Sequence, residues 1–186
     1  SDLSDDPMVW KRTVNAFVSI TSMQIALFDI IELLEIPFEG IIGHSFGEVA
    51  CAYADGCITL EQAVLTAYWR GYVVETSSLP KGTLAAVGMT WKEAKQRCPP
   101  GVVPACHNGS DSVTISGLVE PTKKFVEELH KENIFARLVA GGEYPYHSPH
   151  MNAVADDLIR ELSKVIPEPK KRSSKWISTS YPRREW

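Results

Sequence analysis

The fold is decided at Phe38-Glu39-Gly40-Ile41-Ile42-Gly43-His44-Ser45-Phe46-Gly47-Glu48, where a short apolar run leads into a Gly-x-Ser-x-Gly pattern. The run predicts a buried strand, and the residues from Phe46 to Tyr53 predict a helix. A serine on the sharp turn between them projects its hydroxyl above the sheet edge, where helix N–H groups could bind an oxyanion. Gly43 and Gly47 leave room for a strained backbone. The pattern predicts Ser45 as a nucleophile, with a simple Gly/Ser turn as the alternative.

The composition excludes several classes of protein. With 186 residues, the chain can form one sizeable core, or one core plus a small appended unit. The net charge of -4 gives no general attraction to nucleic acid or to an anionic membrane. We expect no apolar stretch of membrane-spanning length, and the N-terminal residues do not form a signal peptide. The four cysteines form no Cys-x-x-Cys pair, which favours reduced thiols in a cytoplasmic protein.

The order of the predicted helices and strands changes along the chain. A long amphipathic helix runs from Trp10 to Ile36 before Pro37, and Thr59 begins a second helix with a capping box. From residue 82 the order becomes strand, helix, strand, strand, helix, strand, which is typical of a ferredoxin-like unit. Its strands are expected at 84–89, 102–107, 113–117 and 134–139, with the middle two joined by an Asn108-Gly109 turn.

After Gly141-Gly142 the chain is predicted to return to the first unit, with a helix from about His150 to Val165 and a short apolar piece at Trp176-Ile177. We therefore predict an α/β protein with a hydrolase-like parallel-sheet core. That core is formed by residues 1–81 and 146–186, and a ferredoxin-like α+β subdomain is inserted at 82–145.

A serine nucleophile needs a base, and histidine is the usual one. His147 lies where the chain returns from the inserted unit, just before a helix, and is the best candidate on position. His44 adjoins Ser45, but neighbouring strand residues face opposite ways. His147 and His150 could form a metal pair, yet no third ligand pattern accompanies them, so no metal site is predicted.

Several motifs in one order carry a resemblance to a known family. They are Gly43-His44-Ser45-Phe46-Gly47-Glu48, Tyr68-Trp69-Arg70-Gly71 and Tyr146-His147-Ser148-Pro149, with a strand-rich insert before the last. Together they resemble the acyltransferase domain of fatty acid and polyketide synthases. The stretch from Cys98 to Asn108 resembles the malonyl/acetyltransferase of animal fatty acid synthase in particular, or of a closely related polyketide synthase.

The resemblance implies a role for each matching residue. Ser45 would take the acyl group from coenzyme A, His147 would be its base, and the Phe46 N–H would bind the oxyanion. Arg70 would pair with the malonyl carboxylate, since a guanidinium can hold it with two parallel hydrogen bonds. The other predicted substrate contacts are made by His44, Phe46 and Tyr146.

The implied reaction is transfer of malonyl from coenzyme A to the phosphopantetheine of an acyl carrier protein domain. No bound cofactor is implied, because coenzyme A thioesters are the substrates. The other implied partners are neighbouring domains of a multidomain synthase, whose parent chain would be a homodimer.

The sequence leaves the acyl group, the extent of the domain and the role of Arg70 open. Phe46 departs from the leucine, valine, isoleucine or glutamine common in relatives, and Tyr146 from the phenylalanine usual in the animal enzyme, so methylmalonyl or acetyl could replace malonyl. A Gly-Gln-Gly segment and a downstream loop known in the family are not found, so the chain is expected to be the central part of a larger domain. For Arg70, the alternative is a helix-surface residue paired with Glu75 or Asp55.

Two other functions remain as alternatives. An α/β-hydrolase-type serine esterase or thioesterase shares the serine turn but needs an acidic residue, for which Asp111 is available. A non-catalytic structural fragment of a synthase is the other alternative, and it would fail to acylate at Ser45.

Overall fold

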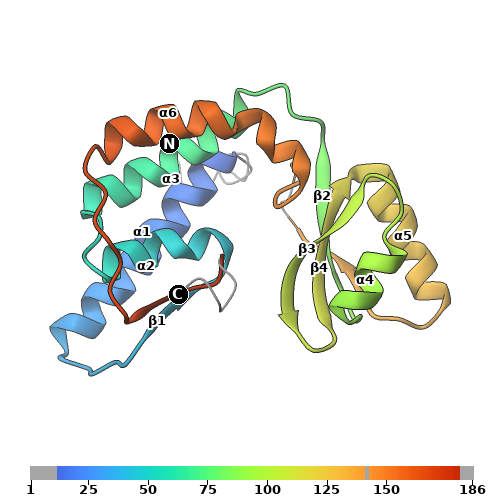
Figure 1. Cartoon of the computed structure of the whole chain (residues 1–186), viewed down its shortest axis with the longest axis horizontal. Coiled ribbons are helices and arrows are strands. Elements are labelled where there is room, and N and C mark those ends of the chain that lie inside the picture. Colours follow the sequence, from blue (N-terminus) through green and yellow to red (C-terminus); the bar gives the residue numbers. More distant parts are fainter. Residues whose placement is uncertain (1–11, 141–142, 181–186) are drawn as a thin grey trace, which may run out of the picture. The chain divides into compact units, whose positions relative to one another are not determined.

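The computed structural model describes residues 12–140 and 143–180 (Figure 1). The chain divides into two compact units, one formed by Ser1–Thr76 with Asp156–Trp186 and the other by Ser77–Ala155. The subdomain predicted at 82–145 lies inside the second unit, which begins earlier and ends later in the sequence. The predicted helix start at Trp10 and the predicted return at Gly141-Gly142 lie outside the described residues.

The described part of the first unit contains a parallel strand pair and helices. Strand β1 (Ile41–Gly43) pairs with β6 (Trp176–Ser178), with Ile41 opposite Trp176 and Gly43 opposite Ser178. The helices are α1 (Thr13–Leu33), α2 (Glu48–Ala54), α3 (Leu60–Glu75) and α6 (Ala155–Val165). This parallel pairing confirms the predicted α/β core, and β6 begins at the short apolar piece foreseen in the sequence.

Local signals fix the start of α3. Thr59 Oγ1 accepts a hydrogen bond from the Gln62 N–H at 3.2 Å, and Gln62 Oε1 accepts one from the Thr59 N–H at 2.9 Å. These two bonds satisfy N–H groups that a helix start otherwise leaves unpaired. The predicted capping box is therefore confirmed, and with it the point from which α3 carries Arg70.

Helix α1 is long and apolar enough, by length and composition, to cross a membrane, so the expectation that no stretch reaches that length is wrong. Core helices of soluble proteins can have the same length and composition. In α1, the buried side chains are those of Val14, Thr21 and Ile25. Large apolar side chains of α1 that stay exposed are those of Ile20, Met23, Leu27, Ile30, Ile31 and Leu33.

The second unit is a four-stranded antiparallel sheet with two helices (Figure 1). Its elements are β2 (Gly82–Val87), α4 (Trp91–Arg97), β3 (Val102–Gly109), β4 (Ser112–Leu118), α5 (Val119–Lys131) and β5 (Ala136–Leu138). The strand order β3-β4-β2-β5 is that of a ferredoxin-like unit, as predicted. Both helices bury their apolar side chains against one face, in a core that includes Val87, Ala94, Val113, Ile115, Phe125 and Leu129.

The predicted hairpin turn at Asn108-Gly109 is wrong. Both residues lie in β3, and the turn falls at Ser110 and Asp111. The strand continues because the Asn108 side-chain amide donates to Thr114 Oγ1 at 2.9 Å, and Gly109 pairs with Ser112 after a register shift. A side chain engaged with the opposite strand holds Asn108 in the ladder rather than in the turn.

Candidate active site

Ser45 lies on the expected strand-turn-helix. Strand β1 ends at Gly43, a 3-10 turn, η3 (Ser45–Gly47), follows, and α2 begins at Glu48. The backbone of Ser45 has a φ of 54°, in the left-handed region that non-glycine residues rarely adopt. Such a conformation costs about 1–3 kcal/mol and persists only where the surrounding structure holds it. Strain at this residue is what a nucleophile turn requires.

Close packing at Gly43 lets β1 approach α2. A Cβ added at Gly43 would lie 2.6 Å from Cys51 Sγ and 2.7 Å from the Gly47 carbonyl atoms. Gly47 has more room, because its added Cβ would meet only the Gln24 side chain at 3.9 Å. The sequence assigned the same role to both glycines, and the structure supports it for Gly43 alone.

Gly43→Ala should therefore destabilise the protein, by about 1–3 kcal/mol on the scale of an overpacked core. Gly47→Ala should leave stability near that of the wild type, since its backbone φ of -59° suits alanine. Thermal unfolding of the two variants beside the wild type measures the difference. Equal unfolding temperatures for both variants would contradict the packing argument.

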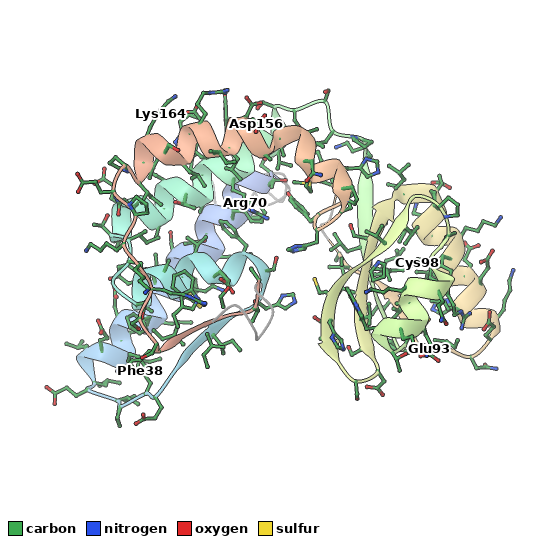
Figure 2. The ribbon with its side chains drawn as sticks, in the orientation of Figure 1. Phe38, Arg70, Glu93, Cys98, Asp156 and Lys164 are labelled. Carbon is green, nitrogen blue, oxygen red and sulfur yellow. The ribbon has the colours of Figure 1, made fainter. Side chains whose placement is uncertain are left out.

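Arg70 lies beside the nucleophile turn. Its side chain extends from α3 toward α1 and the turn (Figure 2), with the guanidinium carbon 5.2 Å from the centre of the Phe46 ring and 5.9 Å from that of Phe17. The two rings lie against each other, with centroids 4.5 Å apart. Stacking on aromatic faces holds a guanidinium by its flat side and directs its N–H donors outward along its plane.

The helix that carries Arg70 is held close to α1. A Cβ added at Gly71 would lie 2.5 Å from Val14 Cα, so only glycine allows the two helices to approach at this point. Both carboxylates considered as surface partners of Arg70 have their own contacts. Glu75 pairs with Arg12 at 3.2 Å, and Asp55 accepts a hydrogen bond from the Ser173 N–H. The motif Trp69-Arg70-Gly71 therefore has a packing role at its glycine and places its arginine beside the turn.

His147 and Tyr146 lie in the second unit. His147 is exposed and has a φ of 59°. Its loop is held by the buried hydroxyl of Ser148, which donates to the Pro145 carbonyl at 2.6 Å. Of the described residues, the non-glycine positions with positive φ are Glu35, Ser45, Asn133 and His147. Both predicted catalytic residues thus lie at strained backbone positions, which functional sites favour.

The structure brings together part of the predicted site. Ser45, Phe46 and Arg70 lie side by side in the first unit. The contact of His147 with Ser45, and the roles of Tyr146 and His44 toward substrate, stay predictions. His44 is exposed and lines a cavity of about 360 Å³ between α1, β1 and α2. That volume falls within the range of about 300–1,000 Å³ usual for small-molecule sites.

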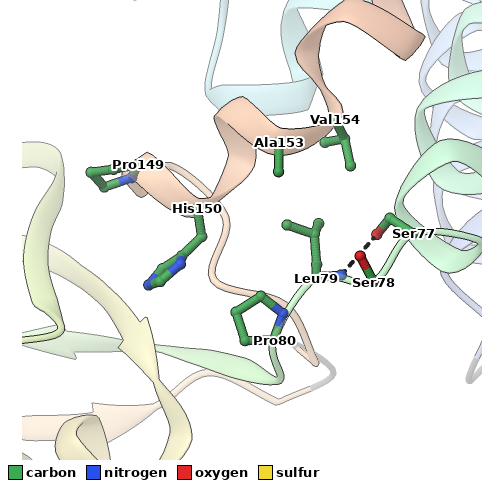
Figure 3. Close-up of a pocket in the computed structure, with 8 residues that line it drawn as sticks. All are labelled: Ser77, Ser78, Leu79, Pro80, Pro149, His150, Ala153 and Val154. Carbon is green, nitrogen blue, oxygen red and sulfur yellow. Dashed lines mark hydrogen bonds between the residues drawn. The ribbon is translucent and has the colours of Figure 1, made fainter.

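A smaller cavity in the second unit is lined by His150, three residues after the predicted base (Figure 3). It lies between Ser77-Ser78-Leu79-Pro80 and the segment that starts at Pro149, and its volume is about 250 Å³. Part of its wall is fixed by the Leu79 N–H, which donates to Ser77 Oγ at 3.3 Å. Its volume lies below the usual range for ligand sites of about 300–1,000 Å³, and no ligand is assigned to it.

The sequence missed a cluster behind the nucleophile turn. The Glu48 carboxylate accepts hydrogen bonds from Ser178 Oγ, at 2.9 and 3.0 Å to its two oxygens, and from the Thr179 N–H. Thr179 Oγ1 lies 3.1 Å from the same carboxylate and 2.7 Å from the Gly43 carbonyl oxygen. The only signal in the sequence was the position of Glu48 at the end of the motif. Phe17, against which Phe46 packs, was also missed as a site residue.

The thiol packed against Gly43 at the turn, that of Cys51, has a raised pKa. Burial, with a smaller contribution from the Glu48 charge, raises the pKa of Cys51 to about 11. Burial likewise raises the pKa of Cys98 to about 11. Because the thiolate is the nucleophilic form of cysteine, neither residue competes with a serine at neutral pH.

Asp111, the acidic residue considered for the hydrolase alternative, lies between β3 and β4 of the second unit. Asp111 is exposed at the tip of the β3–β4 hairpin, where it accepts a hydrogen bond from Ser110 Oγ at 3.4 Å. Within residues 12–140 and 143–180, no group of three or more His, Cys, Asp and Glu side chains is placed to hold a metal ion.

Comparison with known proteins gives consistent matches over the chain. A family model described as the acyl transferase domain matches residues 3–185. Squalestatin hexaketide synthase of a Phoma species is 36% identical over 185 residues, which is 98% of this chain and 7% of that protein. The hybrid PKS-NRPS synthetase gkaA of Penicillium citrinum is 37% identical over 173 residues, which is 89% of this chain and 4% of that protein.

Solved structures share the fold. A loading acyltransferase from the avermectin modular polyketide synthase matches with a TM-score of 0.84 at 24% identity, over 96% of this chain and 57% of that one. The malonyl CoA-acyl carrier protein transacylase of Coxiella burnetii matches with a TM-score of 0.76 at 25% identity, over 91% of this chain and 55% of that one. The chain thus spans little more than half the length of these structures and a small fraction of the synthases.

Proposed function

This chain belongs to the acyl transferase domain family, and we propose that it loads malonyl from coenzyme A onto an acyl carrier protein domain through an ester on Ser45. The observation that carries the proposal is the Arg70 guanidinium, whose carbon lies 5.2 Å from the ring centre of Phe46, the residue that follows Ser45. A planar cation beside the nucleophile suits an acyl group that ends in a carboxylate. The similarity to polyketide synthases favours polyketide synthesis as the setting.

In the proposed reaction the Ser45 hydroxyl attacks the thioester carbonyl while His147 accepts its proton. The Phe46 N–H stabilises the oxyanion of the tetrahedral intermediate. The intermediate collapses to the serine ester, and the coenzyme A sulfur leaves with the proton from His147. The thiol of the carrier's phosphopantetheine then attacks the ester, and the same steps run in reverse to free Ser45. The chemistry uses no resident cofactor.

The acyl group taken up and the acceptor that removes it distinguish the proposed acyltransferase from an esterase and from a non-catalytic fragment. The intact protein is mixed with malonyl-, methylmalonyl- and acetyl-CoA, its mass is measured, and a carrier protein bearing phosphopantetheine is then added. We expect a stable malonyl adduct that disappears only when the carrier is present. Rapid loss of the adduct to water would favour the esterase, and no adduct with any thioester would favour a non-catalytic fragment.

The setting of the reaction follows from the size of the relatives. Because the chain matches only 4% and 7% of those two synthases, we propose neighbouring domains and a carrier domain as its partners. A homodimeric parent synthase and a cytoplasmic location complete the proposal.

His147→Ala should slow acylation of Ser45 by about 10²-fold or more, the scale of general acid–base catalysis. The matched control is His150→Ala, three residues further on in the 3-10 turn Pro149–Val154, which should acylate at the wild-type rate. Rapid mixing with malonyl-CoA followed by mass measurement gives both rates. If His147→Ala and His150→Ala lower the acylation rate by the same factor, His147 has no role as the base.

A further inference from the structure

We propose that Glu48 is a positioning residue for the Ser45 nucleophile, acting through a clamp formed with Ser178 and Thr179, the Glu48 clamp. The proposal rests on the proposed function, because it assumes that Ser45 is the reacting group. Glu48 is the first residue of α2, directly after the turn, and Gly43 is the last residue of β1, separated from the turn by His44.

Thr179 contacts both ends of the turn. Its hydroxyl lies 2.7 Å from the Gly43 carbonyl oxygen and 3.1 Å from the Glu48 carboxylate. A hydroxyl has one proton to donate, so further donors must hold the carboxylate. The Thr179 N–H and the buried Ser178 hydroxyl supply them. The end of β6 therefore fixes the span between the strand that enters the turn and the helix that leaves it.

A fixed span matters because the turn is strained. Ser45, with a φ of 54°, lies in a backbone region that is disfavoured unless its neighbours hold it. Without the clamp, the ends of the turn can separate and the backbone at Ser45 can relax. A displacement of about 1 Å in a reacting group can cost about 10²-fold in rate.

The clamp also controls a charge near the reaction. A carboxylate beside the turn would oppose the negative charge that develops during attack on the thioester. The hydrogen bonds from Ser178 and Thr179 hold both carboxylate oxygens of Glu48 on the β6 side of α2. Glutamine keeps one acceptor oxygen at this position and alanine keeps none, so the two substitutions should be graded in their effects.

Asp55 provides a matched control at the other end of α2. It is the C-cap residue of the helix, and its carboxylate accepts hydrogen bonds from the Ser173 N–H at 2.7 Å and from the Ser173 hydroxyl. Like Glu48, it ties α2 to the segment that contains β6. Asp55→Ala therefore removes similar hydrogen bonds away from the turn, and a purely structural loss should be alike in both variants.

The experiment compares the full chain as wild type, Glu48→Ala, Glu48→Gln and Asp55→Ala. Acylation by malonyl-CoA is followed by mass over a range of concentrations, and amide hydrogen exchange is measured on peptides that span the turn. Glu48→Ala should lower the saturating acylation rate about 10²-fold with little change in half-saturation. Glu48→Gln should fall between it and the wild type, and Asp55→Ala should keep the wild-type rate. Exchange at the turn should rise most in Glu48→Ala, to a smaller extent in Glu48→Gln, and not in Asp55→Ala.

Equal rates in Glu48→Ala and Asp55→Ala, at equal folded fraction, would overturn the proposal, as would unchanged exchange at the turn. If the wild type takes no acyl group, the proposed function fails, and the exchange measurement alone decides the clamp. Thr179→Val provides a second route if Glu48→Ala does not fold. It removes the hydroxyl that contacts both ends of the turn at an exposed position, and the same loss of rate and protection is expected.

Discussion

Ser45→Ala should abolish the mass gain that the chain shows with malonyl-CoA. The proposed reaction joins the acyl group to the oxygen of Ser45, so removing that oxygen leaves nothing for the thioester carbonyl to bond to. Half-buried Ser45 lies at a strained turn of φ 54°, a conformation that alanine can share, so the variant should fold. Intact-protein mass after incubation with the thioester measures the adduct, and thermal unfolding confirms that the variant is folded.

Cysteine acylation is the main artefact to exclude in that experiment. At pH 7, a thiol with a pKa of about 11 is ionised in only about one molecule in 10⁴, which applies to both Cys51 and Cys98. Burial also raises the pKa of Cys57 and Cys106. An adduct that persists in Ser45→Ala at neutral pH would place the chemistry at another residue and end the proposed mechanism.

Local signals in the sequence predicted much of the fold. The capping box at Thr59 places the N-cap of α3, where Thr59 Oγ1 accepts from the Gln62 N–H at 3.2 Å. The strand-turn-helix around Ser45 was foreseen for the same reason, because its glycine and serine spacing is set within a few residues. The predicted helix from about His150 was partly wrong, since residues Pro149–Val154 form a 3-10 turn before α6 begins.

Contacts between distant segments could not be predicted from one sequence. Glu48 and Ser178 are 130 positions apart, and neither residue type nor local pattern marks them as partners. The Phe17–Phe46 contact likewise joins α1 to the turn across two separate elements. Parallel pairing of β1 with β6 creates the first of these contacts, so the support of the turn became visible only with the tertiary structure.

Arg70→Ala should collapse malonyl transfer while sparing acetyl transfer. Removing one partner of a buried charge pair typically costs about 3–5 kcal/mol, which is a factor between 10² and several thousand. The guanidinium of half-buried Arg70 lies over the Phe46 ring beside Ser45, and in the proposed reaction it pairs with the carboxylate of the acyl group. The acetyl group lacks that carboxylate and should lose little. The measurement is kcat/KM for malonyl-CoA and acetyl-CoA in the wild type and the variant.

Arg70→Lys is the sharper test of geometry, because it keeps the positive charge and removes the paired N–H donors of the planar guanidinium. A lysine ammonium is tetrahedral and cannot present two parallel hydrogen bonds from one plane, so only part of malonyl transfer should return. Arg137→Ala, on β5 in the second unit, is the control for loss of one arginine and should alter neither substrate. If Arg70→Ala instead loses malonyl and acetyl transfer equally, the guanidinium holds the turn through Phe46 rather than the substrate. The assignment of a carboxylated acyl group would then fail, because its selectivity depends on Arg70 alone.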